Sequence, residues 1–412
     1  MKQIITTIVV LIFVANVSCQ KEDAISEENK IINLDEKSAL LIEAENDFGF
    51  ELFQNVFASE TEFENIMVSP LSVSLALAMT YNGANGETKS AMEKTLKVYG
   101  LTPDDINTSY HNLIEALKSL DPKVLLEIAN AIYYRDGFTV ENEFISINKN
   151  YYDAEVSALD FSSPQAVNTI NDWVAEKTHD KIETILEEIT GDQVMFLLNA
   201  IYFKGIWAKE FNVESTESLP FYLENGTTIL TETMQRLDTL PYTSNDLFSA
   251  VKLSYGEGNY NMFVFLPETG NSIQEIINKL DKDNWKIWME SFQETQSVDI
   301  KLPRFKYEYE ITLNDVLTEM GMGIAFTGAA DFTGINRGGG LQIGFVKHKT
   351  FVEVNEEGTE AAAVTIVSIE KLSAEEPQKI PFYVNRPFIY AITEKDTGAI
   401  LFIGTVKNPQ LN

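Results

Sequence analysis

Ten residues at positions 194–203, VMFLLNAIYF, constrain the fold of this chain more than any other stretch. Asn199 is the one strongly polar member, so the run does not alternate between polar and apolar side chains as a half-exposed strand does. A continuously apolar run of this length predicts a β-strand that is buried on both faces. The chain has 412 residues, 44% of them hydrophobic, and therefore has ample material for such a core.

Helical patterns dominate the first half of the sequence and strand patterns dominate the second half. Ser69-Pro70, for example, supplies a cap residue and a first-turn proline for a buried helix that ends at Asn82-Gly83. The predicted helices are 38–59, 71–81, 86–98 and 311–320. The predicted strands are 124–134, 194–203, 248–255, 260–266, 298–302, 341–355, 380–393 and 399–406. Because no Pro-, Gly- or Ser-rich linker separates the two halves, the pattern predicts an α+β fold in one large unit.

The sequence contains none of the short motifs that carry common catalytic chemistry. We find no nucleophile elbow, no zinc-protease motif, no phosphate-binding loop and no paired C-x-x-C. Of the three histidines, His111 and His179 lie in polar segments, and His348 lies inside a buried strand pattern. A hydrogen-bonded core histidine is a better interpretation of His348 than a catalytic base. We therefore expect no enzymatic activity, no metal site and no cofactor.

The net charge of −31 makes the protein strongly acidic. Nucleic acids, heparin-like polyanions and anionic lipid headgroups are bound through basic patches, so these partners are not expected. A membrane contact is expected only through an N-terminal lipid anchor.

The N-terminus carries the pattern of an export signal. Lys2 precedes an apolar run at 4–14, which is too short to span a bilayer, and Cys19 lies where a bacterial lipoprotein signal is cleaved and acylated. We expect residues 1–18 to be a lipoprotein-type signal peptide, 19–38 a flexible acidic tether and 39–412 a single domain. The mature protein would be anchored at the periplasmic face or the cell surface. An ordinary signal peptide, giving a secreted protein, is the alternative.

One segment near the C-terminus, VNEEGTEAAAVTIVSIEKLSAEEP at 354–377, combines patterns that rarely occur together. A glycine and three alanines are followed by the β-branched run 364–367 and then by a polar stretch that ends in Pro377. As a helix start, the segment would fail within two turns. In a strand, Thr359 and every second residue to Val367 would share a small-sided face, with Glu360 on the opposite face.

Six stretches in the same order resemble the serpins, a family of mostly serine-protease inhibitors. The resemblance covers about residues 40–410. The stretches are NIMVSPLSVSLALAMTYNGANGETKSAMEKTL (65–96), INDWVAEKTHDKIETIL (170–186), FLLNAIYFKGIWAKEF (196–211), LPRFKYEYEITLNDVLTEMGMGIAFTGAADFTGI (302–335), HKTFVEVNEEGTEAAA (348–363) and NRPFIYAITEKDTGAILFIGTVKNP (385–409).

The resemblance implies a serpin fold of three β-sheets with eight or nine helices and an exposed reactive-centre loop at about 356–380. It also implies suicide-substrate inhibition of serine endopeptidases, and of cysteine endopeptidases as a further class. A protease attacks the loop, and the cleaved loop then inserts into the central sheet and carries the acyl-enzyme to the far end. The protein would act as a monomer. A non-inhibitory serpin that serves as a binding or chaperone module is the alternative.

The resemblance also assigns roles to individual residues. The polar cluster that gates the sheet opening would be Ser69, Ser72, Asn199 and His348, and Trp207 would mark the place where insertion begins. The hinge residues would be Glu357, Gly358, Thr359, Glu360, Ala361, Ala362 and Ala363.

Counting from Gly358 in the serpin register places the cleaved bond at Leu372-Ser373, which suits elastase-, chymotrypsin- or subtilisin-like proteases. The bond Lys371-Leu372, which suits a trypsin-like protease, is the alternative.

Overall fold

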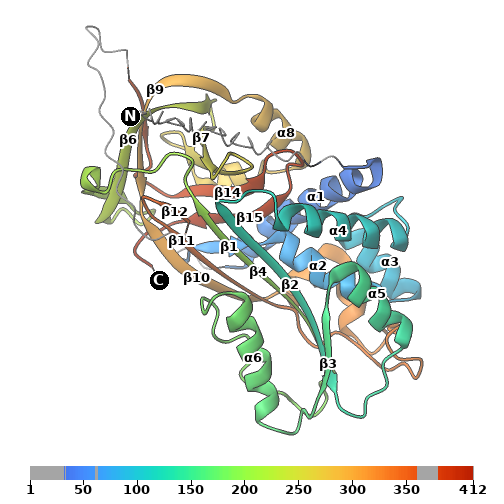
Figure 1. Cartoon of the computed structure of the whole chain (residues 1–412). Coiled ribbons are helices and arrows are strands. Elements are labelled where there is room, and N and C mark those ends of the chain that lie inside the picture. Colours follow the sequence, from blue (N-terminus) through green and yellow to red (C-terminus); the bar gives the residue numbers. More distant parts are fainter. Residues whose placement is uncertain (1–31, 33, 61–63, 360–378, 412) are drawn as a thin grey trace, which may run out of the picture. The chain divides into compact units, whose positions relative to one another are not determined.

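The computed structural model describes residues 32, 34–60, 64–359 and 379–411. In this part of the chain, nine α-helices and two hydrogen-bonded sheets make an α+β arrangement, as predicted (Figure 1). The helices are α1 (Glu36–Ser59), α2 (Pro70–Tyr81), α3 (Gly86–Thr95), α4 (Pro103–Lys118), α5 (Asn142–Tyr152), α6 (Gln165–Lys177), α7 (Ile273–Ile277), α8 (Lys282–Glu290) and α9 (Asn314–Leu317).

The smaller sheet has six strands and contains most of the apolar run at 194–203. That run forms β4, which pairs antiparallel with β2 along eleven residue pairs, from Val124–Gly205 to Tyr134–Met195. In spatial order the strands are β10 (Phe305–Thr312), β11 (Lys347–Val354), β12 (Gly358–Thr359), β4 (Met195–Ile206), β2 (Val124–Arg135) and β3 (Glu155–Leu159).

The larger sheet has nine strands that meet at the long strand β6. Near its end, β6 pairs with β7 through Tyr242–Ser244, while the rest of β6 pairs with β9 and β5, with a register shift between Asp238 and Leu240. The larger sheet can be divided at β6 into two sheets that share this strand. Together with the smaller sheet, the protein then has three sheets. The strands are β1 (Ile66–Val68), β15 (Ile400–Val406), β14 (Phe388–Glu394), β8 (Tyr260–Pro267), β7 (Phe248–Tyr255), β6 (Thr228–Ser244), β9 (Gln293–Pro303) and β13 (Ile380–Tyr383), with β5 (Glu217–Tyr222) beside β6.

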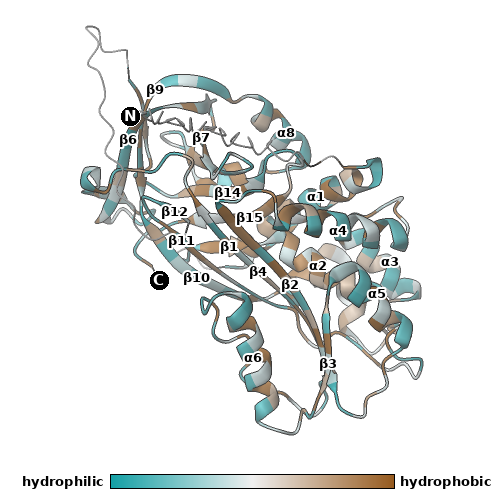
Figure 2. Cartoon of the chain, viewed as in Figure 1, coloured by the Kyte–Doolittle hydropathy of each residue, from teal (hydrophilic) through white to brown (hydrophobic). Residues whose placement is uncertain are grey.

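Helix α2 lies in the core between the two sheets. It begins as predicted, because the Ser69 side chain accepts a hydrogen bond from the Ser72 backbone and Pro70 occupies the first turn. The helix packs against β4 on one side and β15 on the other, so nearly all of its residues are buried. Figure 2 shows apolar residues concentrated in α2, β14 and β15 and polar residues on outer helices such as α5.

Helix α6 covers the opposite face of the smaller sheet. Trp173 of α6 contacts Tyr133 of β2 edge-to-face at 6.5 Å between ring centroids, in a second apolar cluster that also holds Phe196 of β4. The predicted strand at 194–203 is therefore confirmed and is covered on both faces. Leu197 and Leu198 are nevertheless only half-buried, because they border a cavity in the sheet.

Three predicted elements differ from the structure. The strand at 341–355 begins only at Lys347, and residues 341–346 line the cavity instead. The strand at 380–393 is two strands, β13 and β14, because Pro387 lacks an N–H group for a continuous ladder. The helix predicted at 311–320 is shorter in the structure. Its first two residues belong to β10, α9 covers only Asn314–Leu317, and a π-turn follows.

The first helix begins earlier than the predicted domain boundary at residue 39. Asp35 accepts a hydrogen bond from the Ser38 backbone at 2.7 Å and caps α1, so the helix includes the last three residues of the predicted tether at 19–38. Across the described residues, no helix combines the length and the apolar character that crossing a bilayer requires.

Candidate functional site

Two residues of the predicted hinge, Gly358 and Thr359, lie in the smaller sheet. Gly358 and Thr359 form strand β12, which lies between β11 and β4 (Figure 1). Thr359 pairs with Val354 of β11 and Gly205 of β4, and Gly358 pairs with Ile206. Within the described residues, β11 and β4 have no pairing with each other, so two strand edges face one another beyond β12.

Two glycines allow the backbones of β12 and β4 to approach closely. Gly358 has φ +151°, and a Cβ at this position would lie 2.0 Å from the carbonyl oxygen of Gly205. A Cβ on Gly205 would lie 2.9 Å from the ring of Tyr255. A side chain at position 358 would therefore displace the hinge from the sheet, and one at position 205 would displace the rings of Tyr255 and Phe203.

Thr359 points into the core at the place where β12 enters. Its hydroxyl lies 2.7 Å from the hydroxyl of Tyr255, and burial raises the pKa of Tyr255, so this phenol stays protonated. Trp207 stacks on Tyr255 at 4.4 Å with an interplanar angle of 12°. The indole N–H of Trp207 donates to the carbonyl of Asn355, and its backbone N–H donates to the carbonyl of Glu357, so Trp207 holds the chain at the start of the hinge.

A buried carboxylate anchors the segment before the hinge. Glu356, with a side chain 5% exposed, accepts hydrogen bonds at 2.8 Å on both oxygens from Nε of Arg304, whose Nη2 lies 2.6 Å from Oε1. Thr216 donates a further hydrogen bond to the same carboxylate, and Phe211 donates its backbone N–H to the Glu356 carbonyl. The next carboxylate, Glu357, has a raised pKa because of burial and neighbouring acidic groups.

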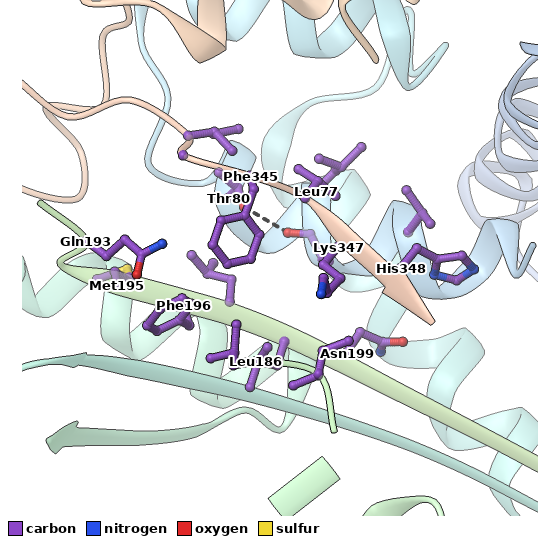
Figure 3. A pocket seen from close by; sticks show the side chains of 18 of the residues that line it. Leu77, Thr80, Leu186, Gln193, Met195, Phe196, Asn199, Phe345, Lys347 and His348 are labelled. Carbon is purple, nitrogen blue, oxygen red and sulfur yellow. Dashed lines mark hydrogen bonds between the residues drawn. The ribbon is translucent and has the colours of Figure 1, made fainter. Parts of the chain in front are cut away.

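The four predicted gating residues lie around the sheet opening but do not form one hydrogen-bonded cluster. Ser69 donates its backbone N–H to Nε2 of His348 at 3.0 Å, and Ser72 is joined to Ser69 by the helix cap. Asn199 of β4 instead donates to Asn130 of β2 at 2.8 Å. Figure 3 shows His348 and Asn199 on the two strands that border the opening.

His348 is a hydrogen-bonded core histidine, as its sequence context predicted. It is 5% exposed, and burial lowers its pKa to about 4. The ring is therefore neutral at physiological pH, with Nε2 as the acceptor for the Ser69 N–H. This contact joins β11 to the start of α2, so the edge of the opening is tied to the helix behind it.

A cavity of about 570 Å³ continues the line of β12 between the two strand edges (Figure 3). Residues 193–201 of the β4 side and 339–349 of the β11 side form its long walls, and α2 and the segment after α6 close it. Its lining is largely apolar, with Leu77, Phe196 and Phe345 among its members. The structure thus leaves room for further strand residues beside β12.

The polar groups of the described residues do not suggest a metal-dependent site. No group of three or more His, Cys, Asp or Glu side chains in this part of the chain is arranged to hold a metal ion.

Comparison with known proteins agrees with this geometry. The family model described as Serpin (serine protease inhibitor) matches residues 43–409. The chain belongs to the serpin family. Its α+β architecture is the serpin fold that the sequence resemblance implied, and the family consists generally of protease inhibitors that do not themselves catalyse a reaction.

Individual serpins are similar over most of their length. An uncharacterized serpin-like protein of Methanosarcina acetivorans is 35% identical over 89% of this chain and 86% of its own length. Human Serpin I2 is 30% identical over 88% of this chain and 90% of its own. The crystal structure of tengpin, a thermophilic serpin in its native state, matches with a TM-score of 0.82 and 35% identity, covering 92% of this chain and 96% of tengpin.

Several predicted residues of this serpin lie outside the described part of the chain. The hinge residues Glu360 and Ala361 to Ala363, the alternative cleaved bonds among Lys371, Leu372 and Ser373, and the proposed lipidation site Cys19 are among them. Their roles stay predictions.

Sequence reasoning missed three contacts of the hinge. Arg304 is 52 positions from its partner Glu356, Tyr255 is 104 positions from Thr359, and Gly205 is important only because the chain of β12 passes over it. Nothing in the local pattern around these residues signals such pairings. The glycine within FKGIW was the one available hint, since an isolated glycine in a strand suggests close backbone approach.

Proposed function

We propose that this serpin is a suicide-substrate inhibitor of serine endopeptidases. The observation that carries the proposal is the position of Gly358 and Thr359, which form a strand between β11 and β4, while no described residue pairs with these two strands beyond β12 on their facing edges. Cleavage of the loop would free the residues after Thr359 to continue this strand. The protein then has both the place for a new strand and its first two residues.

The register of β12 supports this path. Thr359 faces the core, so every second residue after it, beginning with Ala361 and Ala363, would face the same way in a continued strand. These side chains are small, and Glu360 would lie on the opposite face. About 13 strand residues, from 360 to 372, at ~3.3 Å each would move a tethered protease by roughly 43 Å.

The free energy for insertion would come from filling two exposed strand edges. Each new ladder hydrogen bond contributes about 1 kcal/mol net, so a strand of this length is favourable by the order of 10 kcal/mol before chain entropy is counted. The uncleaved form is then a kinetically trapped state that the intact loop keeps from completing the sheet.

We propose Leu372-Ser373 as the cleaved bond, with Lys371-Leu372 as the alternative, because these fall at the serpin distance from Gly358. The first bond suits elastase-, chymotrypsin- or subtilisin-like proteases, and the second suits trypsin-like proteases.

The test is to mix the protein with elastase-, subtilisin- and trypsin-like proteases and to separate the products on denaturing gels. An inhibitor gives a protease adduct that survives denaturation, and the mass of the released C-terminal peptide identifies the cleaved bond. The variant Thr359→Arg should still be cleaved but should form less adduct, because a charge would replace the buried hydroxyl. Cleavage by every protease without an adduct or loss of protease activity would refute inhibition and favour the binding or chaperone role.

We also propose that the protein is exported and anchored through Cys19 at the periplasmic face or the cell surface, because the first 19 residues carry the lipoprotein pattern. Metabolic labelling with a fatty acid should mark the parent protein and not Cys19→Ala. Equal labelling of the two, or export of an unlabelled parent, would refute the anchor and favour secretion.

A further inference from the structure

Two side chains that line the cavity between β4 and β11 have an unused hydrogen-bonding atom. Asn199 of β4 and His348 of β11 lie on opposite sides of this cavity, whose volume is about 570 Å³ (Figure 3). The side-chain oxygen of Asn199 is buried and accepts no hydrogen bond. Within the described part of the chain, the ring of His348 makes one hydrogen bond, with the backbone N–H of Ser69. Buried polar groups without partners in a cavity of this size are typical of a ligand site.

The surrounding hydrogen bonds show which atoms are free. Asn130 donates its side-chain amide to the Tyr152 carbonyl at 2.7 Å, so its oxygen is the atom that accepts from Asn199 at 2.8 Å. Asn199 therefore has its own side-chain oxygen left as an acceptor. His348 accepts on Nε2 from Ser69 and is neutral, because burial lowers its pKa to about 4, so the ring proton lies on Nδ1. The two residues supply one acceptor and one donor.

The donor and the acceptor lie at the same level of the opening and on the same face of the smaller sheet. Thr359 of β12 pairs with Gly205 of β4 and with Val354 of β11. Asn199 comes six residues before Gly205, and His348 comes six residues before Val354, so the two side chains lie across the opening from each other. A molecule between the two strands can therefore reach both of them.

The charged residues around the cavity disfavour an anionic ligand. Lys347 and Lys349 also border the cavity, but they alternate with His348 along β11 and so belong to the other face of the sheet. Each is paired with a carboxylate of β10, Lys347 with Glu310 at 2.7 Å and Lys349 with Glu308 at 3.2 Å. A buried carboxylate in the cavity would have no cation of its own, whereas a neutral polar group needs only hydrogen bonds.

We propose that this cavity is a binding site for a small neutral molecule with an apolar body and one group that both donates and accepts a hydrogen bond, a hydroxyl or an amide. The polar group accepts from Nδ1 of His348 and donates to the side-chain oxygen of Asn199. The apolar body lies along the largely apolar lining.

A molecule bound here and a further strand exclude each other, because the cavity continues the line of β12. The ligand thereby keeps β4 and β11 apart and unpaired, and loop insertion stops. This consequence for inhibition rests on the proposed function, whereas the binding site itself does not.

The first test compares probes of similar size on the full chain at pH 7.2, with dissociation constants measured by ligand-observed NMR. The probes are 1-octanol, octanamide, octanoate and heptyl methyl ether, an isomer of octanol that accepts a hydrogen bond but donates none. We expect saturable binding of octanol and octanamide, with the tighter of the two identifying the preferred group. The ether should bind about two- to tenfold more weakly than octanol, because it leaves Asn199 without a donor, and octanoate should show no saturable binding.

Variants locate the site. Asn199→Ala should remove the difference between octanol and the ether, a change that a merely structural role for Asn199 does not produce. Ala76→Leu, which fills the cavity from α2, should abolish binding of both probes. Leu230→Ser, on the exposed face of β6, is the control for apolar binding at the surface and should bind as the parent does.

Equal affinities of the parent for octanol, the ether and octanoate would overturn the site, as would undiminished binding by Ala76→Leu. A gel assay for protease adducts, with octanol at saturation and the ether at the same concentration as control, tells the two proposals apart. Adducts that form without any saturable octanol binding remove the ligand site alone. Saturable binding in a protein that never forms adducts removes inhibition alone, and adducts undiminished by bound octanol refute the competition with the strand.

Discussion

Replacing Tyr255 by Phe removes one hydroxyl from the hinge and leaves the ring that stacks on Trp207. The lost hydroxyl lies 2.7 Å from that of Thr359. Tyr255 is fully buried and Thr359 is 4% exposed, so water does not take the place of the missing partner. A buried hydroxyl without its hydrogen bond costs about 1–3 kcal/mol. This cost destabilises the state in which β12 is paired with β4 and β11. Thr359→Val, which keeps the shape of the side chain, should cost a similar amount.

Amide hydrogen exchange of the peptide that covers residues 355–359 measures the local opening of the hinge. Because 1.4 kcal/mol is a factor of ten, each single variant should exchange about 5- to 150-fold faster than the parent at the same pH. The double variant Tyr255→Phe with Thr359→Val should exchange at a rate close to that of either single variant or slower, since it leaves no hydroxyl unpaired. Strictly additive effects, with a coupling energy within about 0.3 kcal/mol of zero, would refute the hydrogen bond as the hinge anchor.

Three further predictions concern the stability of the protein and the position of the hinge in the sheet. Glu356→Ala should lower the free energy of unfolding by about 2 kcal/mol in urea titrations, less than for a fully buried pair because Arg304 is 40% exposed; an unchanged midpoint would contradict the anchor. Burial raises the pKa of Glu45 to about 8 from its ordinary value of 4.5, so the folded state binds an extra proton between these values. The free energy of unfolding should therefore fall by about 1.4 kcal/mol per pH unit as the pH rises from 5 to 7.5. Glu45→Gln should remove that slope, and the same slope in both proteins would disprove the assignment. Gly358→Ala should expose the hinge to rapid hydrogen exchange, because its Cβ would lie 2.0 Å from the Gly205 carbonyl oxygen; parental protection would show that the backbone can move aside.

Much of the fold follows from local patterns in the sequence. Helix α2 was predicted from Ser69 and Pro70, and β4 from the apolar run at 194–203, because capping and hydrophobic periodicity act over a few neighbouring residues. The strand predicted at 341–355 was wrong in its first six residues, because strand formation also requires a partner strand that a local pattern does not supply. The pattern of residues 341–346 is compatible with a strand, but the structure gives this segment no neighbouring strand to pair with.

The candidate site was predicted in part. The glycine and alanine pattern marked Gly358 and Thr359 as a hinge, and the buried context of His348 indicated a hydrogen-bonded core residue. Asn199 was expected within the same polar cluster, yet it bonds to Asn130 across the β2–β4 ladder. Which side chain a polar residue meets across a sheet depends on the strand register, and a single sequence does not specify that register.

The sequence by itself determined that the segment after Gly358 is compatible with a buried strand. Small and β-branched side chains after Gly358, and the absence of charge on the face that runs from Thr359 to Val367, are properties of composition and alternation that hold in any tertiary setting. The tertiary structure decided where Gly358 and Thr359 lie and which contacts hold them there. Residues more than 50 positions apart hold the hinge between β11 and β4, as Arg304 with Glu356 and Tyr255 with Thr359 do. Their contacts arise only when the two sheets have packed, because hydrogen bonds act over a few ångströms in space and not along the chain.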